Sequence, residues 1–332
     1  MLSIAIIILG LFLIFRDKNK LSIDEKNWIS KNQNTLIDVR IINDVGTFGY
    51  NGEGVFFDFI HYFSQNHNLM INPITFSHGT FTEGLSFNIG NAYTPNDILL
   101  YKDHYVIVSE NDKSLLSIND LNGSKIGVMS TDLAYISYYL SNINATYTQI
   151  ENKDNLNREI EIQDYLIIPL NLFLETILRN NYYINYHLSD VYQYYYLSLG
   201  DNKILSSILN KSYNTWSIEA FEESYYKNLF STYARALNIT DVEIHELTSR
   251  EYNYGLVEYK PYEIMKNGQI GGLNHHILSQ FSKMTNVEFK YTKYSSMTNL
   301  AKAINKNKVD IYYNRTKIDD NYQKIDSLKL NQ

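Results

Sequence analysis

Three polar residues, Ser130, Thr131 and Asp132, stand between the strand-like run KIGVM and the helix-like run LAYISYYL. Hydroxyl groups and unpaired N–H groups at a helix N-terminus can bind an anion or a dipole. Ligands of open α/β sheets also collect at the carboxyl ends of strands. The pattern therefore predicts that Ser130 and Thr131 line a ligand site. Simple capping of the helix by one of the three residues explains the same pattern.

Two carboxylates in polar loops are further candidates. Asp44 lies in the Gly- and Asn-rich stretch NDVGTFGYNGEG, and Asp97 ends the stretch Thr94-Pro95-Asn96-Asp97. Either carboxylate suits a cationic ligand. The alternative is an ordinary solvated loop, where exposed Asp is common.

The sequence contains no recognisable catalytic motif. It has no cysteine, which excludes thiolate chemistry, disulfides and Cys-ligated zinc. His275 and His276 are adjacent on a predicted helix, outside any HExxH pattern, and we interpret them as surface or structural residues. No nucleophile elbow, P-loop or GxGxxG is present. We therefore expect no catalytic residue, no cofactor and no metal in this chain, and an output enzyme domain would lie in a missing C-terminal part.

Length and composition indicate a folded chain with about two domains. The 332 residues are 44% hydrophobic and 14% aromatic, enough for well-formed cores. The net charge of -7 argues against nucleic acid as a partner, because nucleic acids bind basic surfaces. The 30 tyrosines fit the Asn-, Ile- and Lys-rich bias of an AT-rich genome and do not by themselves indicate an aromatic binding surface.

An apolar segment precedes the first predicted domain. Residues 2–15 are apolar except Ser3, and the basic stretch RDKNK follows. As a helix these residues would rise about 21 Å, short of the roughly 30 Å hydrocarbon core, although tilt can close the difference. We interpret 1–20 as a membrane anchor or a signal segment. A buried core helix is the alternative, and the positive charges after the segment argue against export.

The chain then alternates strands and helices, which predicts a layered α/β fold. Ser22 and Glu25 have the spacing of a capping box and predict a helix that carries Trp28. Runs 36–42 and 69–76 read as strands around a helix at 55–68. Further strands are expected within 104–112, 125–129, 163–178 and 192–199, each followed by a polar loop or a helix.

The opening pattern returns late in the sequence. Residues 252–294 again read as strand, aromatic loop, Gly, helix and strand, so that Phe48-Gly-Tyr50 answers to Tyr262-Glu-Ile264. Gly54 answers to Gly271, and Asp58 to His275. The stretch LTSRE at 247–251 echoes LSIDE at 21–25. Repetition at this long spacing predicts tandem domains.

Several stretches together resemble the type II periplasmic solute-binding proteins, the family 3 extracellular binding domains, in the tandem form found on membrane-bound sensors. They are LSIDEKNWI, FGYNGEGVFFDFI, LNGSKIGVMSTDLAYISYYL, YLSLGDNKILSSILNKSYNTW and VEYKPYEIMKNGQIGGLNHHIL. Their order covers nearly everything after residue 20. The resemblance implies an α/β fold of two lobes joined by crossover strands, with a ligand clamped between the lobes.

The resemblance also implies domain boundaries. The first solute-binding domain would span 21–246, with lobe one at about 36–107 and 195–232 and lobe two at about 108–194. Residues 247–332 would form only the first lobe of a second copy, so the chain would be a fragment or its second copy degenerate.

Amino-acid binders of this family hold the ligand carboxylate with an arginine after a threonine, and here Asp97 falls where that arginine would be. Asn171 likewise stands where a carboxylate would hold the ligand amino group. The clamp for a typical amino acid is therefore absent. The residues expected to bind a ligand, neutral or cationic, are Asp44, Phe48, Tyr50, Thr94, Ser130, Thr131 and Asn171.

The resulting hypothesis is an extracytoplasmic small-solute sensor region of a membrane signalling protein, with its domains outside the cell membrane. One alternative is the substrate-binding component of an ABC-type transporter, against which the missing lipid-attachment cysteine and the second copy both count. Another is a degenerate binding domain with a structural role. A homodimer formed through the full-length protein is an open expectation.

Overall fold

The computed structural model describes residues 19–77, 81, 83–266 and 268–314. The chain forms two compact units, Met1–Leu237 and Asn238–Gln332. Sequence analysis placed this division after Glu246, whereas the second unit begins before the helix α9 (Asp241–Thr248).

A mixed eight-stranded sheet organises the first unit, in the order β4-β1-β5-β10-β6-β9-β7-β8. Its strands are β1 (Leu36–Ile42), β4 (Met70–Phe76), β5 (Leu85–Gly90), β6 (Ile98–Ser109), β7 (Lys125–Met129), β8 (Thr146–Ile150), β9 (Tyr165–Pro169) and β10 (Tyr183–Leu199). β1 is parallel to β4 and β5, and β7 is parallel to β8 and β9. The antiparallel strands β10 and β6 join these two parallel groups.

Helices pack around this sheet, and a small hairpin of β2 (Asp44–Val45) and β3 (Gly49–Tyr50) follows β1. The helices are α2 (Ile23–Asn32), α3 (Val55–His67), η1 (Ile118–Leu121), α4 (Leu133–Tyr139), η2 (Lys153–Asn155), α5 (Leu156–Ile162), α6 (Leu170–Arg179), α7 (Lys203–Glu219) and α8 (Phe221–Ala236). The predicted capping box is confirmed: Ser22 accepts from Glu25 N, and the Glu25 carboxylate accepts from Ser22 N.

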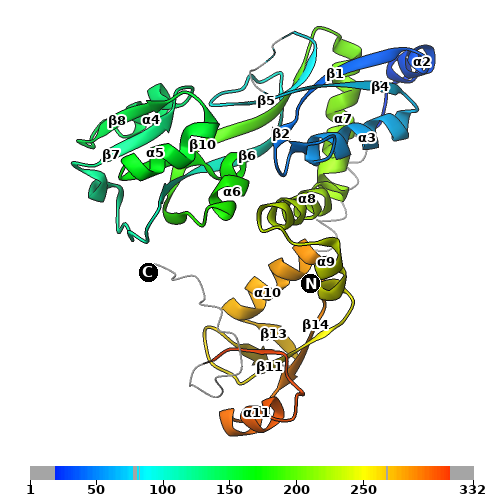
Figure 1. Cartoon of the computed structure of the whole chain (residues 1–332). Coiled ribbons are helices and arrows are strands. Elements are labelled where there is room, and N and C mark those ends of the chain that lie inside the picture. Colours follow the sequence, from blue (N-terminus) through cyan, green and yellow to red (C-terminus); the bar gives the residue numbers. More distant parts are fainter. Residues whose placement is uncertain (1–18, 78–80, 82, 267, 315–332) are drawn as a thin grey trace. The chain divides into compact units, whose positions relative to one another are not determined.

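The first unit has two lobes that share the two long strands (Figure 1). Lobe one holds β1 to β5 with α2, α3, α7 and α8, and lobe two holds β7 to β9 with α4 and α5. β6 and β10 run from one lobe into the other and pair along most of their length, with register shifts, one of them between Leu188 and Tyr192. These two strands form the hinge.

Each lobe has its own hydrophobic core. Lobe one buries aromatic rings from α3, including Phe56, Phe59 and Phe63, against β5 and α7. In lobe two, neighbouring residues of one strand face opposite sides of the sheet. Ile107 therefore joins the core under α4, and Val106 joins the core under α5 and α6.

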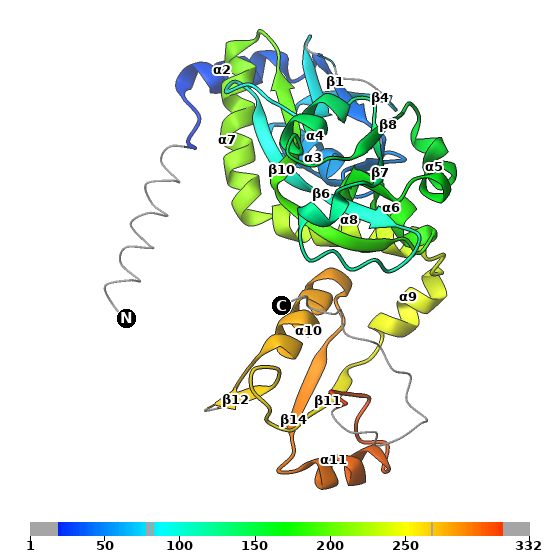
Figure 2. The same cartoon turned by 90° about the vertical axis from the view of Figure 1, so that its left-hand side faces the viewer.

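The second unit contains a small parallel sheet in the order β14-β11-β15. Its elements after α9 are β11 (Tyr252–Leu256), the hairpin β12 (Ile264–Lys266) and β13 (Gln269–Gly271), α10 (Leu273–Thr285), β14 (Phe289–Lys293), α11 (Met297–Ile304) and β15 (Ile311–Tyr312). Figure 2 shows α10 alongside β14. His275 of α10 packs edge-on against Tyr291, and Leu300 of α11 lies over Gly255 on the other face.

The second unit repeats the start of the first. Sheets β4-β1-β5 and β14-β11-β15 have the same order, and a hairpin precedes α3 and α10, which are both 13 residues long. The predicted match of Phe48 with Tyr262 agrees, because their carbonyls accept from Phe56 N and Asn274 N, each two residues beyond the helix N-cap. The N-cap glycines are Gly54 and Gly272, however, so Gly54 answers to Gly272 rather than to Gly271.

The predicted strands at 36–42 and 125–129 and the helix at 55–68 correspond to β1, β7 and α3. LTSRE does not start a helix, because Leu247 and Thr248 end α9, whose capping box is formed by Thr240 and Glu243. The apolar segment 2–15 lies outside the described residues. Within the described part of the chain, the helices are too short or too polar to cross a bilayer.

Candidate ligand-binding cleft

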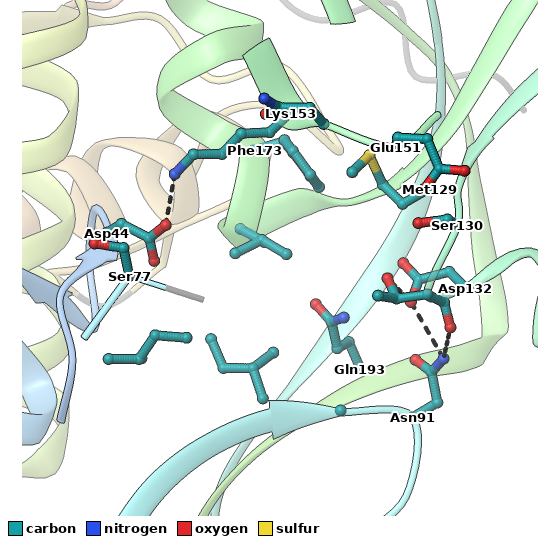
Figure 3. A pocket seen from close by; sticks show the side chains of 16 residues that line it. Asp44, Ser77, Asn91, Met129, Ser130, Asp132, Glu151, Lys153, Phe173 and Gln193 are labelled. Carbon is teal, nitrogen blue, oxygen red and sulfur yellow. Dashed lines mark hydrogen bonds and ion pairs between the residues drawn. The ribbon is translucent and has the colours of Figure 1, made fainter. Parts of the chain in front are cut away.

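A cleft of about 640 Å³ lies between the two lobes of the first unit (Figure 3). Much of its lining comes from residues just after the carboxyl ends of strands. In lobe one these are Asp44 after β1, Ser77 after β4 and Asn91 after β5; in lobe two they are Ser130 to Asp132 after β7 and Glu151 to Lys153 after β8. Both parallel groups of strands therefore point their carboxyl ends at one space, the place where open α/β sheets bind ligands.

The floor and sides of the cleft are largely apolar. Ile42 and Ile89 contribute from lobe one, and Leu172 and Phe173 come from the first turn of α6. Gln193 of the hinge strand β10 is the one hinge-strand side chain of the described lining, and Figure 3 shows it between Asp44 and Asp132. The cleft thus combines apolar walls with a few polar groups, as small-molecule sites do.

An ion pair crosses the cleft. Lys153 Nζ in η2 lies 2.6 Å from Asp44 Oδ2 in β2, and the two side chains are 39% and 19% exposed. The contact joins lobe one to lobe two without any covalent or strand connection. It can therefore influence how far apart the lobes lie.

A second contact between the lobes lies near the hinge. Asn91 Nδ2 donates to Asp132 Oδ1 at 3.2 Å, and Thr131 Oγ1 donates to the same oxygen at 3.2 Å. The Tyr105 hydroxyl donates to Asn91 Oδ1 at 2.8 Å. Burial raises the pKa of Asp132, and the hydrogen bonds from Asn91 and Thr131 oppose that rise.

Three of the predicted site residues, Asp44, Ser130 and Thr131, line the cleft. Asp132, their neighbour, is the N-cap residue of α4, but its side chain makes no capping hydrogen bond. Plain capping therefore does not account for Asp132. Its carboxylate also places negative charge where the sequence pattern indicated an anion receptor.

The two predicted aromatic residues do not line the cleft. Phe48 has no exposed surface, because the β2–β3 hairpin folds it into the core of lobe one, where its ring centroid lies 4.3 Å from that of Tyr195. Tyr50 instead lies under the guanidinium of Arg235, which is 4.2 Å from the ring centroid.

Thr94 and Asn171 also have other surroundings. Thr94 lies in a separate depression with Tyr93 and Tyr196, and its N–H donates to Asp97. Asn171 is buried, and its N–H and amide group both donate to Asp103. Whether any of the seven predicted residues touches a ligand stays a prediction.

Sequence analysis missed Asn91, Asp132, Lys153 and Gln193 as site residues. Ligands of α/β sheets collect at the carboxyl ends of strands, and this rule would have found two of them. Asn91 follows β5, and Lys153 lies just beyond β8. Gln193 carries no such signal, because it lies within β10 on the same face as the core residues Val191 and Tyr195. In the described residues no group of three or more His, Cys, Asp or Glu is placed to hold a metal ion.

No protein-family model and no curated protein matches this sequence. Among solved structures, the chain is similar to the VFT2 domain of Bordetella pertussis BvgS in a double-mutant form, with 13% identity, a TM-score of 0.51, and coverage of 62% of this chain and 97% of that domain.

Two further structures are similar with lower scores. The periplasmic domain of B. pertussis BvgS has 12% identity and a TM-score of 0.48 over 88% of this chain. This chain covers 63% of that domain, so it spans less than two thirds of its length. The amino acid ABC transporter substrate-binding protein AbpA of Streptococcus pneumoniae, bound to L-arginine, has 13% identity and a TM-score of 0.46 over 61% of this chain and 97% of that one.

These likenesses concern the fold. The expected fold class is confirmed: the first unit is a two-lobed α/β domain of the type II periplasmic-binding-protein, or Venus flytrap, kind.

Proposed function

We propose that this chain is the extracytoplasmic ligand-binding region of a membrane signalling protein, and that its first unit binds a small solute between its two lobes. The cleft carries the proposal. Strand ends from both lobes converge on it, and in the described part of the first unit the strands β6 and β10 connect the lobes. A pair of lobes joined in this way can close around a ligand by a hinge motion, and the closure is the signal.

Two features favour a sensor over a delivery protein. The second unit repeats the start of lobe one directly after the first unit, as expected for tandem domains in one receptor. The apolar run 2–15 ahead of the first domain suits an anchor, and the chain has no cysteine for lipid attachment. The alternatives are a component of an ABC transporter and a degenerate structural domain, and each would give a different result in the following experiments.

Ligand-induced closure can be measured by fluorescence energy transfer. Because the chain has no native cysteine, two introduced cysteines label uniquely. Ile74→Cys in β4 and Tyr138→Cys in α4 place dyes on exposed positions of different lobes, and Ile23→Cys with Ile74→Cys places both on lobe one. We expect a solute that binds to raise transfer in the first pair and leave the second pair unchanged. If amines, amino acids, carboxylates and sugars all leave the first pair unchanged, the degenerate structural domain is favoured.

The location is tested with the same exposed position. In cells that express the chain with residues 1–20, Ile74→Cys should react with a membrane-impermeant maleimide before lysis. The protein should also stay in the membrane fraction after carbonate washing. Labelling only after lysis contradicts the extracytoplasmic assignment, and release of a labelled protein as a soluble fraction favours a delivery protein.

A further inference from the structure

Among the described residues, two buried polar oxygens of the cleft lining have no hydrogen-bond partner. They are Oδ2 of Asp132 and Oε1 of Gln193. Asp132 is 1% exposed and Gln193 is 5% exposed. A buried acceptor without a donor costs about 1–3 kcal/mol, and more when it is charged. In native structures most buried polar groups have a partner in the protein, in ordered water or in a ligand.

The neighbouring donors are already committed. Asn91 Nδ2 and Thr131 Oγ1 both donate to the other oxygen of Asp132. Tyr105 has a single hydroxyl proton, which is directed to Asn91 Oδ1. Rotating that proton toward Asp132 would take it away from Asn91 Oδ1.

The two acceptors lie close together in the fold. Tyr194, the residue after Gln193, pairs with Gly90, and the next residue, Asn91, contacts Asp132. Figure 3 shows the Gln193 amide rising into the cleft beside the contact of Asn91 with Asp132. The two side chains therefore lie at the same part of the cleft lining.

The charges of the described lining favour a cation. It contains three carboxylates, Asp44, Asp132 and Glu151, and the cation Lys153, which pairs with Asp44. A ligand carboxylate would meet the Asp132 charge in a poorly solvated place, where like charges repel strongly.

We infer that the cleft binds a small organic ammonium ion without a carboxylate, whose N–H groups donate to Asp132 Oδ2 and Gln193 Oε1. This inference rests on the proposed function. The ammonium supplies the donors and the positive charge that the buried oxygens lack. The apolar side chains of Ile42, Ile89, Leu172 and Phe173 then contact the hydrocarbon body of the ligand.

The test uses the full chain and a matched set of probes that differ in one group. The probes are 2-phenylethylamine, 2-phenylethanol, phenylacetate, phenylalanine, putrescine and glucose, and binding is followed by isothermal titration calorimetry. Asp132→Asn removes the charge and Gln193→Met removes the amide at similar size. Asp190→Asn, an exposed carboxylate on the same hinge strand, is the matched control.

We expect one or both amines to bind, and 2-phenylethanol, phenylacetate and phenylalanine to bind at least tenfold more weakly. Asp132→Asn should weaken amine binding by about tenfold or more and Gln193→Met by several-fold, with Asp190→Asn unchanged. Thermal melting of each variant without probe verifies that it is folded.

Three other results have distinct meanings. If phenylacetate, phenylalanine or glucose binds best and the cleft-filling change Ile89→Trp abolishes that binding, the ammonium inference is wrong and the proposed function stands. If an amine binds equally well to Asp132→Asn, the inference is wrong. If no probe binds and none changes the energy transfer between the lobes, the inference and the proposed function both fall.

Discussion

Lys153 Nζ and Asp44 Oδ2 lie 2.6 Å apart and connect lobe two to lobe one across the cleft. Because Lys153 is 39% exposed, solvent and salt screen the pair, and its worth is at most about 1 kcal/mol. The pair therefore biases the lobes toward closure without fixing them. A ligand can still change the distance between the lobes at small energetic cost.

Lys153→Met should shift the unliganded first unit toward more open forms by up to about fivefold in the open-to-closed ratio, the equivalent of 1 kcal/mol. The energy transfer between dyes at Ile74→Cys and Tyr138→Cys measures the change. Raising the salt concentration should produce part of the same change in the unsubstituted chain. Lys31→Met, on an exposed position of α2, is the control. If Lys153→Met leaves the energy transfer between the dyes unchanged, the ion pair has no role in closure.

Glu25 joins α2 to α7 through a buried ion pair. Its oxygens accept from Lys211 Nζ at 2.7 and 2.9 Å and from Ser207 Oγ at 2.6 Å. Burial alone would raise the pKa of Glu25, but these bonds and that from Ser22 lower it from 4.5 to about 2. A carboxyl group whose pKa is lower in the folded state stabilises the fold fully above its unfolded pKa. This stabilisation is therefore lost as the pH falls from about 4.5 to about 2.

Glu25→Gln should lower the free energy of unfolding at pH 7 by about 2 kcal/mol, and it should remove part of the stability loss between pH 4.5 and pH 2. Urea unfolding at a series of pH values measures both effects. Asp24→Asn, the exposed neighbour in the same helical turn, should change stability by less than about 1 kcal/mol. Equal effects of the two substitutions would show that the Lys211 pair adds nothing beyond helix capping.

Local patterns were enough to predict a layered α/β fold, whereas the two-lobed arrangement was implied by the resemblance to solute-binding proteins. The alternation in 36–42 and the helical spacing in 55–68 identified β1 and α3, because each pattern depends only on which face of that segment is buried. Of the long hinge strand β10, only the part from residue 192 onward was predicted as a strand. Its first half, at 183–191, has several exposed residues and no clean alternation, since it pairs mainly with β6 at the junction of the lobes.

The candidate site was predictable only in part. Asp44 and Ser130 follow strand ends, so a general rule of α/β sheets places them in the cleft lining. Phe48 looked like a loop aromatic that could touch a ligand, but the hairpin turns its ring into the core. Asn171 also follows a strand end, yet Asp103 from a different strand takes up its donors. Such partners are distant in sequence, and no local pattern reveals them.

Asp103 is a fully buried carboxyl group on the hinge strand β6 and has no exposed surface. Burial raises its pKa from 3.8 to about 6, although it accepts hydrogen bonds from Asn171 N, Leu172 N and the Tyr195 hydroxyl. The folded state therefore binds this proton more tightly than the unfolded chain. Its ionisation costs stability as the pH rises from about 4 to about 6, and the cost is then constant.

Asp103→Asn should flatten the part of the stability profile between pH 4 and pH 6, where the unsubstituted chain should lose up to about 2–3 kcal/mol from this group. The side-chain oxygen of Asn can still accept from the N–H groups of Asn171 and Leu172 in the first turn of α6, so the variant should fold. A profile that falls just as steeply in Asp103→Asn would mean that another group is responsible.

Gly271 and Gly272 are adjacent, yet only Gly272 occupies the position that Gly54 has in the first unit. Gly272 has a φ of +98° and a Cβ there would lie 2.5 Å from the Tyr262 carbonyl oxygen, whereas a Cβ on Gly271 meets nothing within 4 Å. Gly54 has a φ of +120°, and a Cβ there would lie 2.5 Å from the Phe48 carbonyl carbon and oxygen.

Gly272→Ala should therefore destabilise the second unit by at least about 2 kcal/mol, because both the left-handed backbone and the close carbonyl oppose a side chain. Gly271→Ala should change stability by less than about 0.5 kcal/mol. Hydrogen exchange of amides in β11 and β14 measures the effect on this unit directly. Equal protection in the two variants, or greater loss in Gly271→Ala, would restore the match of Gly54 with Gly271.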